Sequence, residues 1–213
     1  TLGYNNAFQG AFSVSTAVGV HSVKIATVIS NDVFTIGIDA NDVTGGNGTD
    51  DTVRFIGPGI VRFDHSSNYI GNWSLEGGTT QLGNAASLGA TSARTITLAT
   101  GATLAGRLAA DTTFTANPIT ISGTGTATIQ HDRSLGSGVV YTFGTLGIGS
   151  QTLDINSAGI VNNNTNYGIK LGATTLSGNA VFNVANNGSG TGTLTLASIT
   201  SPAGTSLTKN GNG

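Results

Sequence analysis

The chain has 213 residues, of which only 8% are charged, and its formal net charge at pH 7 is −2. A soluble domain usually carries about 25% charged residues, and the few charges here are scattered, which argues against nucleic-acid binding. Because the chain contains no cysteine, disulfides, thiolate metal sites and a cysteine nucleophile are excluded. No run of about 20 apolar residues occurs, so we expect no membrane span in this segment.

Short alternating runs dominate the chain, and helical patterns are nearly missing. The 33 glycines and the many Thr, Val and Asn residues are poor helix formers. Runs of alternating apolar and polar residues predict strands, and Gly, Asn, Asp or Ser residues that follow them supply the turns. These predicted strands are residues 34–38, 60–63, 95–98, 119–121, 126–129, 152–155, 181–184 and 193–196.

The spacing of these runs favours a solenoid over a closed sandwich or barrel. Many gaps are about 20 to 30 residues, roughly one turn of a three-walled coil, whereas a sandwich needs a hairpin every 8 to 12 residues or so. Aromatic residues make up only 6% of the chain, and we expect the narrow interior of a β-helix to have little use for large rings. The sequence therefore predicts an all-β fold, a right-handed parallel β-helix, with an all-β sandwich or barrel as the alternative.

The chain divides into two predicted regions. Residues 1–52 are expected to form irregular N-terminal coils with a polar Gly/Asp loop, and residues 53–213 to form the β-solenoid coils. The segments 53–59 and 207–213 look like two copies of one repeat head, 154 residues apart (211 − 57). Because one repeat cannot bury its own hydrophobic face, this recurrence predicts stacked coils.

The segment 207–213, LTKNGNG, resembles the head of the autotransporter-associated β-strand repeat, also called the passenger-associated transport repeat. Residues 69–73 and 77–89 resemble the middle and tail of the same repeat, although Arg54 and Phe55 stand where Thr and Lys are usual. The resemblance implies a β-helical stalk or passenger that is exported and displayed outside a bacterial cell. It implies no catalytic residues, because the repeat has none.

A polar loop contains the densest group of candidate cation ligands. Segment 45–50 fits the start of the calcium-binding nonapeptide G-G-x-G-x-D. That fold needs consecutive nonapeptides, however, and Thr52 stands where the large aliphatic should be. We therefore predict a solvated loop and no metal site at the candidate residues Asp39, Asn41, Asp42, Asn47, Asp50 and Asp51.

Paired carboxylates would indicate a carbohydrate-active β-helix enzyme, which is the alternative function. It requires two carboxyl groups within about 10 Å on one wall. The compact acid/base groups are His131-Asp132-Arg133 and Asp64-His65, but neighbours on a strand point to opposite faces, so we predict no catalytic residue and no cofactor. His21 is expected to be a hydrogen-bonded structural residue. The remaining candidates are the acids Glu76, Asp111 and Asp154 and the bases Arg62, Arg94, Arg107 and Lys170.

Threonine pairs suggest a third function, a ligand- or ice-binding wall. Such a wall requires outward Thr side chains in register on at least four consecutive coils, whereas alternation alone places a Thr outward on any of these strands. The pairs are Thr95/Thr97, Thr120/Ser122, Thr126/Thr128 and Thr193/Thr195.

The leading expectation is a structural or adhesive extracellular segment of a large bacterial surface or secreted protein. Its expected partners are neighbouring repeats of the same chain or copies of itself, stacked end to end or laterally, together with a surface or glycan target. Open solenoid ends are unpaired strand edges, and neither end of this sequence shows an obvious polar cap, which is why we expect such stacking.

Overall fold

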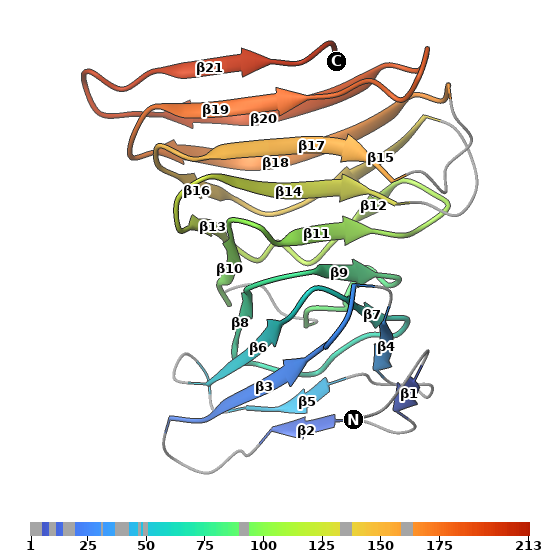
Figure 1. Ribbon diagram of the computed structural model, residues 1–213. Coiled ribbons are helices and arrows are strands. Elements are labelled where there is room, and N and C mark those ends of the chain that lie inside the picture. Colours follow the sequence, from blue (N-terminus) through green and yellow to red (C-terminus); the bar gives the residue numbers. More distant parts are fainter. Residues whose placement is uncertain are drawn as a thin grey trace.

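The computed structural model describes residues 6–8, 12–14, 20–30, 32–36, 43–46, 48, 51–89, 94–132, 138–158 and 164–213. Every regular element of more than one residue in these ranges is a β-strand, and all paired strands run parallel (Figure 1). The chain forms a parallel β-solenoid, which confirms the predicted fold class. Within the same ranges, no helix has the length and apolar character needed to cross a bilayer.

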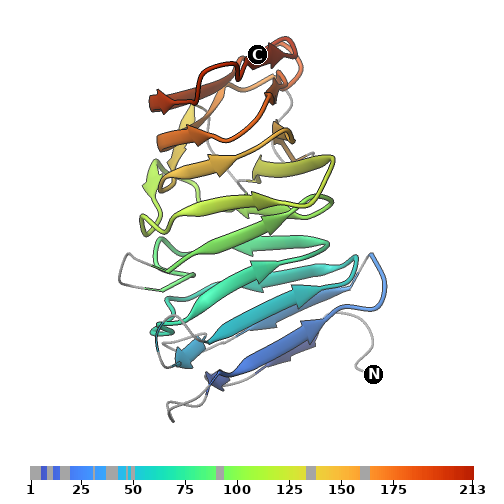
Figure 2. The same cartoon turned by 90° about the vertical axis from the view of Figure 1, so that its left-hand side faces the viewer.

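One side of the solenoid is a nine-stranded parallel sheet, called the front sheet here. Neighbours in space are one coil apart in sequence, as expected when the chain returns to the same side once per turn (Figure 2). Its strands in spatial order are β1 (Asn6–Phe8), β4 (Val33–Ile36), β7 (Ile60–Phe63), β9 (Thr79–Leu82), β11 (Thr103–Gly106), β14 (Thr126–His131), β17 (Thr152–Ser157), β19 (Ala180–Val184) and β21 (Leu207–Asn210).

The second sheet, called the back sheet, has ten strands, nine on its main path and β20 beside β18, and it turns a corner within β18 (Tyr167–Leu176). The first half of β18 pairs with β15 and the second half with β16, so two sides of the coil belong to one sheet. The other strands are β3 (Ser22–Ala26), β6 (Thr52–Ile56), β8 (Asn72–Leu75), β10 (Ile96–Ala99), β12 (Thr112–Thr113), β13 (Ile119–Ser122), β15 (Val139–Thr142), β16 (Leu146–Ile148) and β20 (Gly192–Thr200), which pairs with β18.

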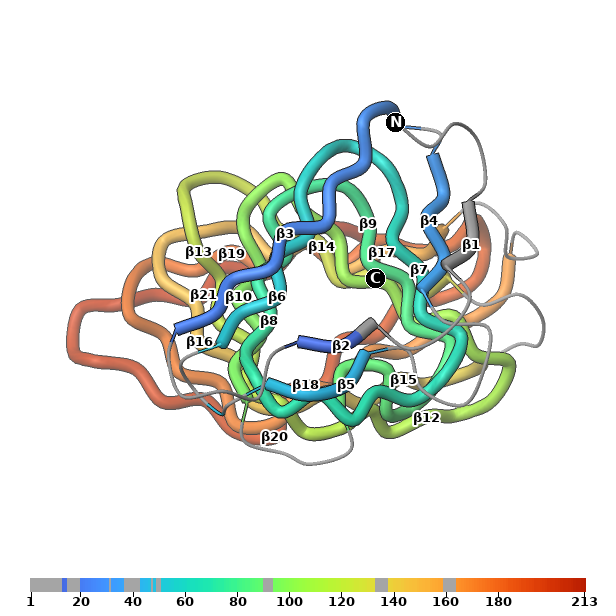
Figure 3. The backbone as a smooth tube through the Cα atoms, turned by 90° about the horizontal axis from the view of Figure 1, so that it is seen from below, coloured from blue at the N-terminus to red at the C-terminus, as the bar shows by residue number. Residues whose placement is uncertain are grey.

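A two-stranded sheet of β2 (Phe12–Val14) and β5 (Val43–Gly45) lies near the N-terminal end of the stack. Viewed along the stack, the chain winds around a common interior (Figure 3). Hydrogen bonds between neighbouring coils join residues 19 apart, as in Arg62 to Gln81, 29 apart, as in Asn183 to Asp154, and 33 apart, as in Leu108 to Tyr141. The expected three-walled coil of about 20 to 30 residues is therefore confirmed.

The predicted strands agree well with those observed. Strands β7, β13, β14, β17, β19 and β20 contain the predicted runs in full, and β10 begins one residue late, at Ile96. The run 34–38 is found as β4, which ends at Ile36, and residues 37 and 38 lie outside the described ranges. The alternation of apolar and polar residues predicts these strands correctly because inward residues are buried and outward ones are not, as the burial of β7 and β17 shows.

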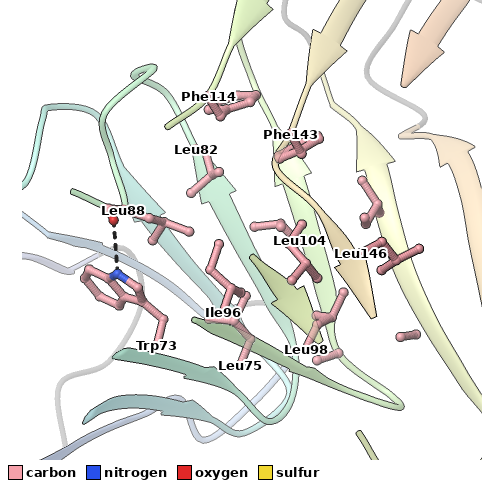
Figure 4. Close-up of a cluster of buried hydrophobic side chains, with 14 of the residues drawn as sticks. Trp73, Leu75, Leu82, Leu88, Ile96, Leu98, Leu104, Phe114, Phe143 and Leu146 are labelled. Carbon is pink, nitrogen blue, oxygen red and sulfur yellow. Dashed lines mark hydrogen bonds between the residues drawn. The ribbon is translucent and has the colours of Figure 1, made fainter. Parts of the chain in front are cut away.

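The interior contains large aromatic rings, so the expectation that it would exclude them is wrong. Trp73 is only 1% exposed and packs against Tyr69, Phe55 and Phe63, with ring centroids 4.9, 5.8 and 5.7 Å away. Figure 4 shows how aliphatic side chains from β8, β9, β10 and β11 fill the space beside this cluster. Rings from β6, β7 and β8 therefore pack together inside the coil.

The two predicted repeat heads occupy different sides of the coil. Residues 53–56 lie in β6 of the back sheet, whereas residues 207–210 form β21 of the front sheet. Both strands end at a glycine of positive φ, Gly57 at 92° and Gly211 at 81°, because each must leave its sheet through a left-handed turn. That the two segments come from one repeat unit, and that the chain divides at residue 52, both stay predictions.

Candidate functional site

The segment that resembles the repeat tail makes hydrogen bonds to Trp73 and to Asn117, which lie on different coils. Residues 83–89 form a turn in which the Asn84 side chain accepts a hydrogen bond from the Ala86 amide at 2.9 Å. The Leu88 carbonyl at its end accepts the indole N–H of Trp73 at 3.1 Å (Figure 4) and the side-chain amide of Asn117 at 3.0 Å. The buried indole thus finds a polar partner, as a buried Trp requires, and this segment has a structural role.

His131 is the last residue of β14, Asp132 follows that strand, and both side chains are buried. His131 is fully buried and its ring stacks on Tyr141, with centroids 4.0 Å apart and planes 5° apart. The Arg107 guanidinium lies 3.3 Å from the Asp132 carboxylate, and the Gln81 side-chain amide also donates to it. The described contacts of His131 and Asp132 thus involve different residues, and Arg133 lies outside the described residues.

Burial dominates the electrostatics of Asp132. Its side chain is 1% exposed, and desolvation raises the pKa of its carboxyl above the ordinary value, more than Arg107 lowers it. Arg62 donates to the Gln81 oxygen at 2.8 Å, which extends the network across the outer surface of the front sheet. Arg62, Gln81, Arg107 and Asp132 thus connect β7, β9, β11 and β14.

The two acid/histidine groups lie far apart on the stack. Backbone hydrogen bonds show that Asp64, Gly83, Arg107 and Asp132 occupy equivalent positions on successive coils. The amides of Gly83, Arg107 and Asp132 each donate to the carbonyl of the residue that ends the neighbouring front-sheet strand. Asp64 and Asp132 are therefore three strand spacings apart at the backbone, about 14 Å at ~4.8 Å per strand. At the backbone, these two residues are therefore farther apart than the spacing of about 10 Å that the glycosidase alternative requires of two carboxyl groups.

His21 is paired with Asp51. The His21 ring nitrogen Nδ1 lies 2.7 Å from the Asp51 carboxylate, which also accepts the His21 backbone N–H at 3.0 Å. Asp51 is fully buried, and the expectation that His21 is hydrogen-bonded is confirmed. Of the polar loop, the glycines at 45, 46 and 48 have positive φ angles of 83°, 88° and 77°. Asp39, Asn41, Asp42, Asn47 and Asp50 lie outside the described residues.

The other candidate acids also bond across coils. Glu76 accepts two hydrogen bonds from Arg54, at 2.7 and 2.6 Å, and this pairing lowers the pKa of the Glu76 carboxyl. Asp111 accepts the Val140 amide at 2.8 Å. Asp154 accepts the side-chain amide of Asn183 at 2.9 Å. Asp111 and Asp154 therefore act as links between one turn of the solenoid and the next.

A shallow polar groove of about 380 Å³ runs along the outer surface of the back sheet, over β3, β6 and β8. Ser22, Thr52 and Asn72 face it in register, and the Thr95 amide donates to the Asn72 side chain at 3.1 Å. Arg54, on the next outward row, lines the same groove. Hydroxyl and amide groups thus recur at the strand spacing along this surface, which we call the polar groove.

Threonines in the described strands do not form the four-coil wall that the ligand- or ice-binding alternative requires. In the paired strands that the structure describes, the longest outward row of threonines is Thr79, Thr103 and Thr128, and Asp154 takes the next position. On the back sheet the row of Thr97 and Thr120 ends at Gly147. The requirement of the wall hypothesis is not met in these strands, since alternation fixes only that a residue points outward and not which residue it is.

Comparisons with protein-family models, with curated proteins and with solved structures find no match for this chain. The fold and the contacts described above establish a β-helix repeat protein. Its function has to be argued from those contacts.

Proposed function

We propose that this chain is a structural and adhesive segment of an exported bacterial surface protein, akin to autotransporter passengers, and that it has no catalytic role. The observation that carries the proposal is that most of the candidate acidic side chains form hydrogen bonds between coils. Four of the five candidate acids each bond to a neighbouring coil, between 22 and 29 residues away: Glu76, Asp111, Asp132 and Asp154. Side chains engaged in this way stabilise a rod.

Composition supports export. The chain lacks cysteine and has few charges, which suits a protein that crosses an oxidising compartment before it folds. The LTKNGNG segment at 207–213 and the tail at 77–89 supply the likeness to passenger repeats. Display of a rod outside the cell would hold a further domain away from the surface or build a fibre.

The adhesive part of the proposal depends on the polar groove. Aligned hydroxyl and amide groups favour a polyhydroxylated partner such as a glycan, because such a chain offers donors and acceptors along its whole length. Thr52→Val and Thr95→Val are expected to weaken binding on a glycan array by about tenfold in combination. Thr120→Val, on the same sheet outside the groove, serves as the matched control. Undiminished binding of the double variant would exclude the polar groove as the glycan-binding surface.

Display can be tested by placing an epitope tag in the turn at Gly204, where the backbone is exposed and no atom lies within 4 Å of an added Cβ. In intact cells of the producing bacterium, antibody should label the tag and external protease should remove it. A cytoplasmic protein monitored in parallel controls for lysis. Labelling that appears only after the cells are broken would refute the extracellular location.

A further inference from the structure

A pocket of about 250 Å³ lies on the outer surface of the back sheet, over β15, β18 and β20. Gly168, between the inward core residues Tyr167 and Ile169, is the outward residue of β18 at this point. Its register partners are Val140 on β15 and Thr193 on β20, so β18 is paired on both sides here. A Cβ atom added to Gly168 would lie 3.0 Å from Val140 Cγ2. The missing side chain therefore leaves a depression with Val140 as one wall, which we call the Gly168 pocket.

A cation without an ionic partner lines the Gly168 pocket. Lys170 is exposed and lies two residues along β18 from the glycine, about 7 Å away at the backbone. Its register partners, Thr142 and Thr195, are neutral, and it forms no ion pair with any residue that the structure describes. Asp111 also lies on this side of the coil, where its carboxylate accepts the Val140 amide at 2.8 Å. The positive charge of Lys170 is thus available to a ligand.

The lining of the Gly168 pocket combines three kinds of group. Val140 offers an aliphatic wall, and Thr193 and Thr195 offer hydroxyls. Lys170 adds a charged donor, which forms stronger hydrogen bonds with an oxyanion than a neutral donor does. An acidic sugar matches all three, because its C–H groups pack on an aliphatic wall, its hydroxyls pair with hydroxyls and its acid group pairs with the ammonium. Pockets that bury a whole drug-sized ligand measure about 300 to 1,000 Å³, so this smaller pocket suits one sugar unit.

We propose that the Gly168 pocket binds one acidic sugar unit of a glycan, with the oxyanion of the sugar on the ammonium of Lys170. A Lys ammonium is a point charge and does not select between carboxylate and sulfate, so the chemistry recognised is an oxyanion on a polyhydroxylated ring. The site shares no residue with the polar groove. It therefore goes beyond the proposed function and depends neither on glycan binding in that groove nor on where the protein is located.

Calorimetry with matched ligands tests the charge requirement. Galacturonate oligomers are compared with their methyl esters, which keep the hydroxyls but lack the charge, and sulfated galactose oligomers with their unsulfated forms. We expect at least one acidic oligomer to bind about fivefold more tightly than its neutral form at low salt. The preference should vanish near 1 M salt, where the screening length is about 3 Å. Equal binding of the acidic and neutral forms in both pairs, or no binding at all, would overturn the proposal. Polyglutamate carries carboxylates without sugar rings, and equally tight binding of polyglutamate would overturn it too.

Lys170→Gln removes the charge and keeps most of the side chain. The variant should lose about fivefold in affinity for the acidic oligomer and bind the neutral form as before. Lys209→Gln is the matched control, because Lys209 is also an exposed strand lysine but lies in β21 of the front sheet. Equal weakening by the two variants would contradict a specific contact at the Gly168 pocket.

Gly168→Thr tests the pocket independently of the charge. Gly168 is not among the glycines of positive φ, so a Thr can adopt its backbone conformation once Val140 shifts, and circular dichroism can check the fold. The added side chain should weaken binding of the acidic and neutral oligomers alike. Gly147→Thr is the matched control, on β16, where an added Cβ has no contact closer than 3.7 Å. A folded Gly168→Thr variant that binds normally would exclude the pocket. The Thr52→Val and Thr95→Val double variant should keep the preference for acidic oligomers, which separates a failure of this site from a failure of the polar groove.

Discussion

Phe63→Ala should destabilise the N-terminal half of the solenoid. The Phe63 ring is 0% exposed and lies 5.5 Å from the Phe55 ring and 5.7 Å from that of Trp73. Removal of a fully buried Phe side chain costs about 3 to 5 kcal/mol, which includes the lost transfer free energy and the cavity left behind. Edge-to-face contacts account for about 0.5 to 1.5 kcal/mol per aromatic pair beyond area burial. We expect a loss near the upper part of that range.

The single tryptophan makes this loss measurable at one place in the stack. Trp73 is the only Trp in the chain and is buried, so urea unfolding followed by its fluorescence reports the coils around β8. Phe182→Ala is the matched variant, because Phe182 is 1% exposed and lies in β19, several coils away. Coils in a solenoid contact only their neighbours, so Phe182→Ala should shift the circular dichroism transition more than the fluorescence transition.

Two outcomes would refute this reasoning. A loss below about 1 kcal/mol for Phe63→Ala would mean that the ring is not packed as described. A fluorescence transition that moves as far in Phe182→Ala as in Phe63→Ala would mean that the chain melts as one unit and that stability is not local to neighbouring coils.

Two further expectations concern charge and backbone packing. Burial raises the pKa of the Asp132 carboxyl above 3.8, so the folded state binds the carboxyl proton more tightly than the unfolded state does. The contribution of this proton to the free energy of unfolding is fully present below pH 3.8 and is lost as the pH rises through the folded-state pKa. Asp132→Asn should flatten this slope in the free energy of unfolding, and an unchanged slope would exclude Asp132 as its source. Gly106→Ala should cost about 1 to 3 kcal/mol, because its Cβ would lie 2.5 Å from the Tyr141 ring. Gly147→Ala has no contact closer than 3.7 Å and should be neutral or stabilising by up to about 1 kcal/mol; equal thermal shifts in both variants would contradict the packing at Gly106.

Local pattern predicted eight of the 21 strands in the described residues, and with them the solenoid. Alternation and turn residues act over a few positions, so runs such as 152–155 were placed correctly from sequence alone. The spacing of the runs then predicted a coil of about 20 to 30 residues. The aromatic interior was missed because Phe55, Phe63 and Trp73 come from three strands that meet only in the folded coil, and no local pattern reports such a meeting.

Contacts between distant residues could not be predicted from the sequence. Gln81 and Asp132 are 51 residues apart, and His21 and Asp51 are 30 apart. The sequence shows these polar residues but not the register that brings them together. The same limit applies to the threonine row, which ends at Asp154 because register decides which outward residues become neighbours.

The register of the stacked coils is the central claim, and paired cysteines test it most directly because the chain has none of its own. Thr103 and Thr128 are register partners on β11 and β14, so their Cα atoms should be about 4.8 Å apart, within reach of a disulfide. Thr103→Cys with Thr128→Cys should form an intramolecular disulfide on mild oxidation. Thr103→Cys with Thr126→Cys, displaced by two residues to about 8 Å, should not. Preferential cross-linking of the displaced pair would contradict the account.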